Sequence, residues 1–429
     1  MGPRVRILLA AAVCLATLAY WMWPQTPKLA PKPVTVTSLS GQLVPRITYY
    51  NRHPGTRANM KLILKRLGLT LTPLDPSVLS GYGMEESAAE AIIDSGFVKL
   101  ICDSSDVIIV SDTIPDPEQQ CSSYIILEAT NRIDYDIKKD IGTYHGMLWK
   151  LANQTPKGKV IFTANNPLEP MDLAREALAA PKWTLLRSTG ASNVAAQSVS
   201  ILEKTKVLFK PHITARIANE VLEKKNLPLK WVNHDYGGPR TAAKYLAFLE
   251  IPYQVSVMKL YENLAHGVVM LVPSKEFFKE LVISRAIVFM YWHKLLLAGD
   301  DWWKYMDYYS DDISPYIYYF DSWDHLSVLI SSFASNPDPK NVREKAPKAY
   351  AQLVTKTIHG WADIFSGIGM NVTVDGQTHV PGREAADLVV QPTLPDGFGG
   401  YKTFAEWKTA YEGPLEVFKK TARKDAPPF

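Results

Sequence analysis

The chain has 429 residues, of which 47% are hydrophobic and 21% are charged, and its formal net charge at pH 7 is +4. This length allows two domains of ordinary size, and the composition is typical of a folded globular protein. So small a net charge does not by itself indicate nucleic-acid binding, and we expect no nucleic-acid partner. The 11 Trp and 21 Tyr would suit stacking against carbohydrate or nucleotide, although core packing is the commoner use of any one of them.

The first residues predict a membrane anchor. Arg4 and Arg6 precede an uncharged apolar run over residues 7–23, which is followed by Pro24. At ~1.5 Å per residue, such a helix spans roughly 25 Å, enough for a thin bilayer. The arginines favour a cytoplasmic tail (1–6), and therefore a single-pass type II orientation with one transmembrane helix. The alternative is a cleaved signal peptide, but bulky aromatic residues stand where a cleavage site needs small ones.

Residues 24–44 are rich in Pro, Lys, Thr and Ser and show no apolar periodicity, so we expect an extended stem. Anchor, stem and globular region together resemble the plan of Golgi glycosyltransferases, which implies the Golgi membrane with the endoplasmic reticulum as the alternative. In an oxidising lumen, Cys102 and Cys121 could form a disulfide, and two free thiols remain the other possibility.

The stretch 45–190 alternates short apolar runs with helical stretches. This pattern predicts a parallel sheet with helices on both faces. The strands are expected at 46–51, 106–112, 123–131, 159–166 and 183–190. No G-x-G-x-x-G follows the first strand, which counts against a dehydrogenase.

Three polar residues in this first domain are candidates for the catalytic base. His53, Glu128 and Asp112 stand at or just after predicted strand ends, where functional groups of parallel sheets gather. We rank them in that order, because an unperturbed histidine titrates close to the working pH of most enzymes. The competing interpretation is loop capping and turn formation, the commonest task of such residues at such places.

The second half of the chain is organised around residues 233–274. We expect a loop containing Gly237 and Gly238, a helix between residues 239 and 251, and a short polar segment over 252–256. A second helix should carry Glu262 and end at Gly267, where a helix-stopping glycine is expected, before a strand begins.

The part of this stretch over 253–274, YQVSVMKLYENLAHGVVMLVPS, resembles the donor-binding signature of GT-B glycosyltransferases. The resemblance implies two Rossmann-like α/β domains that face a cleft, the second spanning 191–429. It places Glu262 at the ribose of a nucleotide sugar, with Tyr253 and Asn263 in the same donor-binding stretch. Gln254 departs from the pattern, since many such enzymes have an acidic residue there. The alternative is a buried amphipathic helix with an exposed glutamate.

The resemblance also implies how the diphosphate would be bound. Gly237, Gly238 and Ser256 would lie near it. Arg187 or Lys210 would balance its charge, so no divalent metal or other cofactor is expected.

Taken together, these features predict a transferase that moves a sugar from a nucleotide-sugar donor to a glycan or glycoprotein acceptor in the secretory pathway. One alternative is a metal-dependent GT-A transferase that uses Asp134 and Asp136, although these acids also suit the first turn of a helix. The other is a catalytically silent, membrane-anchored protein that binds glycans.

Overall fold

The computed structural model places part of the chain, and all of the placed residues belong to one compact unit, 45–429. The described residues are 45–51, 53–74, 97–111, 123–130, 160–175, 183–190, 201–233, 236–289, 292, 295, 299–333, 335–380 and 389–390. The predicted tail, anchor and stem (1–44) lie outside these ranges. Within them, no helix combines the length and apolar character needed to cross a membrane.

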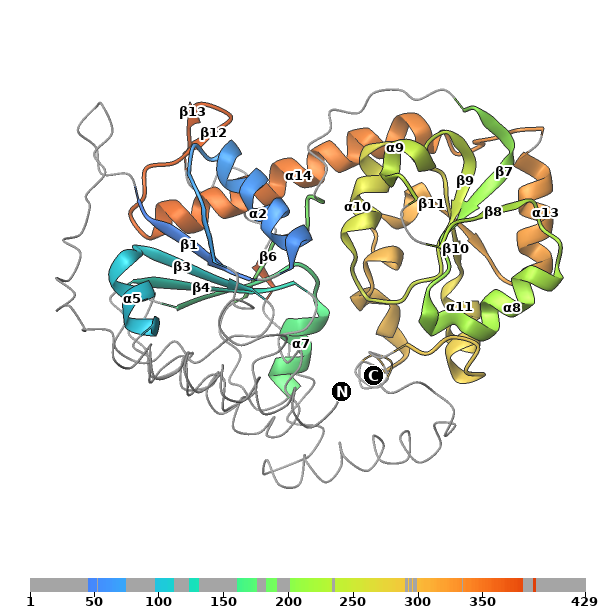
Figure 1. Cartoon of the computed structure of the whole chain (residues 1–429), viewed down its shortest axis with the longest axis horizontal. Helices are drawn as coiled ribbons and strands as arrows, with labels where there is room; N and C mark the ends of the chain where they lie inside the picture. Colours follow the sequence, from blue (N-terminus) through green and yellow to red (C-terminus); the bar gives the residue numbers. More distant parts are fainter. Residues whose placement is uncertain are drawn as a thin grey trace, which may run out of the picture. The chain divides into compact units, whose positions relative to one another are not determined.

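Two separate parallel sheets form the framework, as the sequence predicted (Figure 1). The first sheet has the order β14-β6-β5-β4-β3-β1-β2, and every neighbouring pair is parallel except β14 with β6. Its strands are β1 (Ile47–Tyr50), β2 (Thr72–Leu74), β3 (Val107–Ser111), β4 (Tyr124–Ala129), β5 (Val160–Ala164), β6 (Trp183–Leu185) and β14 (Val389–Val390).

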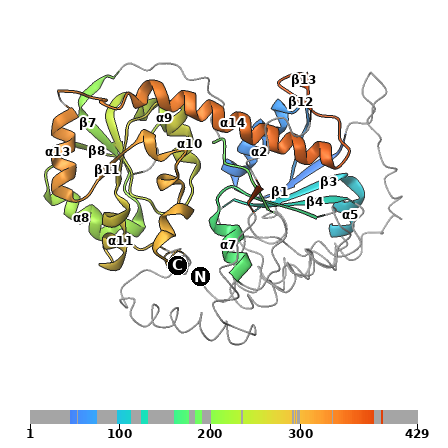
Figure 2. The same ribbon diagram turned by 180° about the vertical axis from the view of Figure 1, so that it is seen from behind.

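Both faces of the first sheet are covered, which explains why its central strands are continuous apolar runs. Helices α2 (Pro54–Arg66) and α14 (Val342–Gly367) contribute to the core on one face. Cys102, in α5 (Phe97–Ser104), contributes to the core on the other face. Figure 2 shows from behind that α14 lies along the α2 side of this sheet. Helix α7 (Leu168–Arg175) follows β5.

The second sheet has the order β11-β10-β9-β7-β8, and all of its pairs are parallel. Its strands are β7 (Glu203–Phe209), β8 (Leu229–Trp231), β9 (Tyr245–Leu249), β10 (Met270–Pro273) and β11 (Ile317–Phe320). Its helices are η1 (Ile213–Ala215), α8 (Arg216–Lys224), α9 (Gly238–Ala242), α10 (Met258–Ala265), α11 (Lys275–Ile283), η2 (Gly299–Tyr305), η3 (Asp307–Tyr309), η4 (Ser314–Tyr316) and α13 (Trp323–Phe333). A hairpin of β12 (Thr373–Val374) and β13 (Gln377–Thr378) follows α14.

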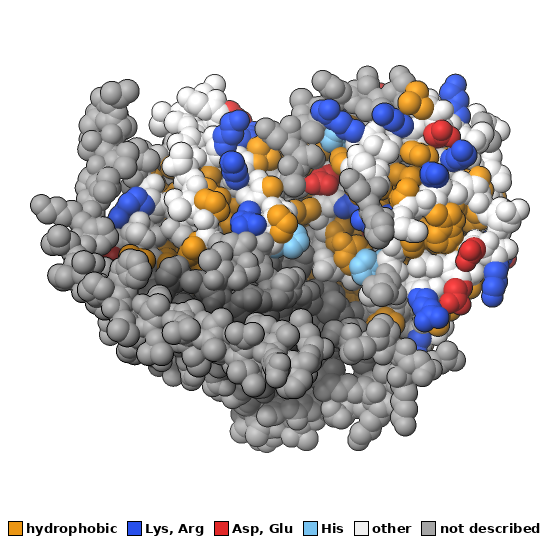
Figure 3. Space-filling model, in the orientation of Figure 1, with side chains coloured by type: hydrophobic (Ala, Val, Ile, Leu, Met, Phe, Trp, Pro, Cys, Tyr) orange, Lys and Arg blue, Asp and Glu red, His pale blue; other side chains and the backbone are white. Residues whose placement is uncertain are grey.

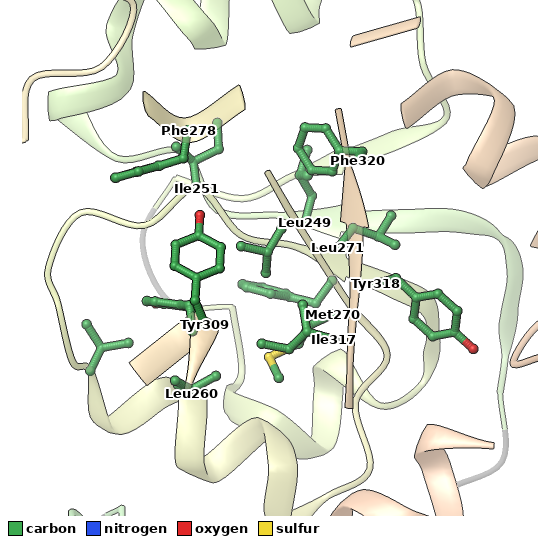
Figure 4. Packing of buried hydrophobic residues seen from close by; sticks show 14 of the residues in the cluster. Leu249, Ile251, Leu260, Met270, Leu271, Phe278, Tyr309, Ile317, Tyr318 and Phe320 are labelled. Carbon is green, nitrogen blue, oxygen red and sulfur yellow. The ribbon is translucent and has the colours of Figure 1, made fainter. Parts of the chain in front are cut away.

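The core of the second sheet joins strand and helix side chains in one cluster. Leu249 and Met270 from the strands are both fully buried, as is Leu260 from α10 (Figure 4). Tyr309 and Phe320 extend this cluster into the aromatic part of the chain. The aromatic stretch around residues 289–320 therefore serves largely as packing.

Helix α14 belongs to both cores. Its first turns bury Val342 and Ala346 in the cluster of the second sheet, and its later turns bury Ile358 and Trp361 in that of the first. One continuous helix thus ties the two sheets together.

The prediction of a helix between residues 239 and 251 is wrong. Only a single turn, α9, forms there, and the apolar run that follows it is strand β9, in the middle of the sheet. A strand buried on both faces lacks the alternation that would reveal it, so a short apolar run can be mistaken for a buried helix. Strand β11 was not predicted either, because its residues are mostly aromatic and show no alternation of apolar and polar residues.

Cys102 is disulfide-bonded, and its partner lies outside the described residues. Because a disulfide restricts the unfolded chain, Cys102→Ala should lower the free energy of unfolding by about 2–4 kcal/mol, measured by urea titration without reductant. A reductant should lower the urea midpoint of the wild type and leave that of Cys102→Ala unchanged. We expect Cys121 to be the partner, as the sequence suggested, so Cys14→Ala is the matched control and should behave as the wild type. An unchanged wild-type midpoint under reductant would contradict the prediction.

Candidate functional site

The second sheet has a topological switch point between β7 and β9. The chain passes from β7 outward to β8 and then returns to β9 on the other side of β7. In open parallel sheets, ligands bind outside the carboxyl ends of the strands at such a point, because the two connections diverge and leave room there. Lys210 directly follows β7 and Glu250 directly follows β9.

Aromatic and charged side chains surround this switch point. The rings of His212 and Tyr253 are stacked, with centroids 4.1 Å apart and planes 8° from parallel. The Nζ of Lys259 lies 2.6 Å from Oε2 of Glu250 and 5.7 Å from the centroid of the Tyr253 ring. The Nζ of Lys210 lies 5.6 Å from the centroid of the Tyr236 ring, next to Gly237 in the chain. Two lysines and a histidine therefore meet at the carboxyl ends of β7 and β9.

The electrostatics of this cluster favour an anion. Burial and the nearby charges of Lys259 and Lys210 lower the pKa of His212. Burial raises the pKa of Glu250, although Lys259 and the hydroxyl of Tyr308 oppose this shift. Burial and the neighbouring Glu250 raise the pKa of Tyr253 to about 12. A negatively charged ligand would relieve the repulsion among the basic groups.

Glu262 lies on α10 against the end of the first domain. A Cβ atom added to Gly190 would come within 2.7 Å of Cγ of Glu262, so the backbone at Gly190 approaches this side chain closely. Gly190 has φ +76°, which glycine adopts readily and other residues rarely do. Glu262 is half-buried, in the middle of α10.

Arg187 and Ser256 are engaged elsewhere. Nη1 of Arg187 donates to Oδ1 of Asp307, whose side chain is fully buried. Burial lowers the pKa of Arg187, but the charges of Asp307 and Asp312 outweigh it and hold this pKa above its ordinary value. Ser256 is 1% exposed, and its hydroxyl lies close enough to the same carboxylate to oppose the rise that burial causes in the pKa of Asp307. Arg187 and Ser256, both predicted near the diphosphate, thus lie beside one internal carboxylate.

Asn263 also points inward. It is 1% exposed, and its Nδ2 lies 3.8 Å from Sδ of Met270 in the core. Gly237 and Gly238 have φ +76° and +71° at the start of α9, so both glycines are required by the turn. The structure thus places Lys210 and Tyr253 just beyond the carboxyl ends of β7 and β9, places Glu262 on the adjoining helix α10, and leaves Asn263 in the core.

The first sheet has its own switch point, between β1 and β3. His53 follows β1 and caps α2, accepting a hydrogen bond from the backbone N of Thr56 at 3.3 Å. A Cβ added to Gly55 would lie 2.9 Å from Cε1 of His53 and 3.1 Å from Sδ of Met258, the first residue of α10. The exposed His53 is therefore a neighbour of the helix that carries Lys259 and Glu262.

Of the other two predicted bases, Glu128 is placed less favourably and Asp112 is not described. Glu128 ends β4 but is only 7% exposed, and its Oε2 accepts a hydrogen bond from the hydroxyl of Tyr49 at 2.9 Å. Asp112 lies outside the described residues, as do Asp134 and Asp136 of the metal-dependent alternative. Among the residues that are placed, no group of three His, Cys, Asp or Glu side chains could hold a metal ion.

Several residues of the cluster were missed by the sequence analysis. Lys259 lies within the stretch that carried the resemblance, and Glu250 ends an apolar run that was mistaken for a helix. The signal that could have found Glu250 is an acidic residue directly after a buried run, which marks a strand end. Tyr308 and Asp307 carry no such signal in the sequence, since only folding brings them to β9 and α10.

Comparisons with known proteins find similarity in fold only. No protein-family model matches the sequence, and none of the curated proteins matches it. A putative UDP-N-acetylglucosamine 2-epimerase from Listeria monocytogenes is 9% identical, with a TM-score of 0.42, over 78% of this chain and 99% of that one. A glycotransferase of kitacinnamycin is 12% identical, with a TM-score of 0.36, over 76% and 99% of the two chains. An O-GlcNAc transferase mutant from Thermobaculum terrenum is 10% identical, with a TM-score of 0.37, over 78% and 69%.

At such identities and TM-scores we draw no functional conclusion from these likenesses. What the fold and site define is an α/β protein with two parallel Rossmann-like sheets and a basic, aromatic cluster at the switch point of the second. On the face drawn in Figure 3, lysine and arginine side chains are interspersed with apolar and acidic ones.

Proposed function

We propose that this protein is a GT-B glycosyltransferase that moves a sugar from a nucleotide-sugar donor to a glycan or glycoprotein acceptor. The observation that carries the proposal is the meeting of Lys210, Lys259 and Tyr253 at the switch point of the second sheet, with Glu262 on the adjoining helix. Basic groups suit the diphosphate, aromatic rings suit stacking, and a glutamate carboxylate suits the two hydroxyls of a ribose.

Among the basic residues, Lys210 is the better counter-charge for the diphosphate. Arg187 is held by Asp307, and Lys259 is paired with Glu250, so the charge of each is largely balanced within the protein. The Nζ of Lys210 contacts an aromatic ring, which leaves its charge for a ligand. With a lysine in this role, the proposed reaction is metal-independent.

His53 is the proposed base for the acceptor hydroxyl. Its ring is exposed and adjoins the start of α10, so an acceptor could reach both it and a donor bound by Glu262. Glu128 is less suited, because its carboxylate is buried and bonded to Tyr49.

We also propose that the protein is a single-pass type II membrane protein of the Golgi, with the endoplasmic reticulum as the alternative. The anchor-like residues 7–23 and the stem-like residues 24–44 support this location. The disulfide bond at Cys102 fits an oxidising lumen.

The proposal is tested by the thermal stability of the full-length protein with UDP, GDP or CMP, each with chelator or with manganese. One nucleotide should raise the melting temperature in the presence of chelator. At 100 times its dissociation constant it should add about 2.7 kcal/mol to the free energy of unfolding. Release of the nucleoside diphosphate from the matching nucleotide sugar should then be measured with a glycan acceptor.

Glu262→Gln should weaken binding of that nucleotide by at least about tenfold, a loss of about 1.4 kcal/mol, because the ribose loses a charged acceptor. Glu223→Gln, at an exposed glutamate of α8, is the matched control and should bind as the wild type. Stabilisation only with manganese would favour the transferase that uses Asp134 and Asp136. No response to any nucleotide would favour the silent glycan-binding protein.

A further inference from the structure

A buried ion pair links the exit of β6 to the loops of the second sheet. The side chain of Arg187 is 11% exposed and that of its partner Asp307 is 0% exposed. Nη2 of Arg187 also lies 3.6 Å from Oδ1 of the half-exposed Asp312. The two members of the pair are 120 residues apart in the chain, so it forms only when the fold is complete.

Asp307 makes several contacts with the loop 250–257, which joins β9 to α10, and with α10 itself. Its backbone N donates to the carbonyl O of Val255 at 2.9 Å. Its carboxylate accepts a hydrogen bond from the hydroxyl of Tyr261 on α10 at 2.5 Å and lies beside Ser256 of the loop. Asp307 therefore contacts both the end of the loop and the helix that carries Glu262.

The segment that carries Arg187 is itself fixed to the first domain. Oγ1 of Thr357 on α14 donates to the carbonyl O of Arg187 at 3.2 Å. Oδ1 of Asn59 on α2 accepts from the backbone N of Thr189 at 2.9 Å and from its Oγ1 at 2.6 Å. The hydroxyl of Tyr350 on α14 donates to the carbonyl O of Thr189 at 2.5 Å. The backbone around Arg187 is therefore held in place by hydrogen bonds to α2 and α14.

A buried ion pair is a poor way to gain stability alone. Removing two charges from water costs as much as or more than their attraction returns, and apolar residues of similar size often stabilise as well or better. The pair, however, sets a direction and a distance that apolar packing does not. The contacts of Asp307 with the loop 250–257 and with α10 indicate that orientation is what the pair contributes.

We infer that Arg187 and Asp307 are positioning residues, whose ion pair fixes the loop 250–257 and helix α10 against the end of the first domain. The pair thereby determines where Tyr253 and Glu262 stand. The expected effect of this ion pair on ligand binding rests on the proposed function, whereas its effect on the placement of the loop does not.

The test replaces the pair by apolar residues of similar size, Arg187→Met with Asp307→Leu, in the full-length protein. A double variant is needed because either single truncation would leave a buried charge without its partner. Amide hydrogen exchange over residues 250–262 should become at least about tenfold faster, while the urea midpoint is not lowered. The dissociation constant for the stabilising nucleotide should rise by at least about tenfold as well.

Arg216→Met with Glu220→Leu is the control, because it removes an exposed ion pair on α8 and should leave exchange in the loop unchanged. If the double variant at Arg187 and Asp307 does not fold, Arg187→Gln with Asp307→Asn removes both charges with less change in shape and is judged by the same exchange criterion. Unchanged exchange over residues 250–262 in the folded variant overturns the inference. Absence of nucleotide binding by the wild type instead overturns the proposed function, and the exchange measurement still decides the inference.

Discussion

Gly267→Ala is expected to lower the free energy of unfolding by about 3 kcal/mol or more, one of the largest effects of any single methyl group in this chain. Gly267 follows α10 with φ +60°, a conformation in which side chains are strained. A Cβ atom there would lie 2.4 Å from the carbonyl O of Arg343 and 2.9 Å from its Cα. The clash is therefore with the backbone of α14, which has no flexible end that could move aside.

The side chain of Arg343 is also fixed, by hydrogen bonds to the start of β9. Its guanidinium donates to the carbonyl O of Ala243 at 2.9 Å, of Tyr245 at 2.8 Å and of Leu246 at 3.0 Å. Moving α14 away from Gly267 would stretch these bonds at the start of β9. The clash at Gly267 would therefore also strain β9, the strand that ends directly before Glu250.

Gly369→Ala is the matched control for backbone strain. Gly369 has φ +87°, but a Cβ atom there meets nothing within 4 Å. Urea titration should thus show a much smaller loss for Gly369→Ala than for Gly267→Ala. Equal losses of stability at the two positions would contradict the prediction. They would mean that the strained backbone conformation alone lowers the stability and that α10 and α14 can move apart to make room for the methyl group.

The fold could be predicted from the sequence where the signal is local. Apolar runs such as the one containing Ile109 identified the strands β1, β3, β4, β5 and β6 of the first sheet, and Gly267 ends its helix as expected. Strand β9 could not be distinguished from a helix, because a strand in the middle of a parallel sheet is apolar on both faces.

The site could be predicted only in part, because spacing along the chain does not determine what a side chain meets. Lys210 stands at the carboxyl end of the second sheet because it directly follows β7, and Glu262 lies on α10, the helix that was predicted to carry it. Arg187 looked equally suitable for a diphosphate, yet Asp307 is its partner, and nothing in the sequence connects two residues so far apart. Asn263 follows Glu262 but lies about 100° further around the helix and enters the core.

Lys259→Met is expected to lower the free energy of unfolding by about 3–5 kcal/mol at pH 8, because it leaves the carboxylate of Glu250 buried without its counter-charge. Nζ of Lys259 lies 2.6 Å from Oε2 of Glu250, and their side chains are 17% and 4% exposed. Lys348→Met is the matched control. Its ammonium lies at the same 2.6 Å from Glu344, but both side chains are largely exposed, so its loss should be small.

The pH dependence of this effect separates a structural lysine from a ligand-binding one. Burial already raises the pKa of Glu250 above its ordinary value, and loss of Lys259, which opposes that shift, should raise it further. In Lys259→Met the folded protein then binds a proton at a higher pH than the unfolded chain does. The destabilisation is therefore complete above the raised pKa and shrinks as the pH falls through it, so urea titrations should differ from the wild type less at pH 5 than at pH 8. Lys259→Met with Glu250→Gln should recover most of the loss and respond less to pH. If Lys259→Met is instead as stable as the wild type at pH 8, Glu250 does not depend on this lysine, and the charge of Lys259 is available to the diphosphate beside that of Lys210.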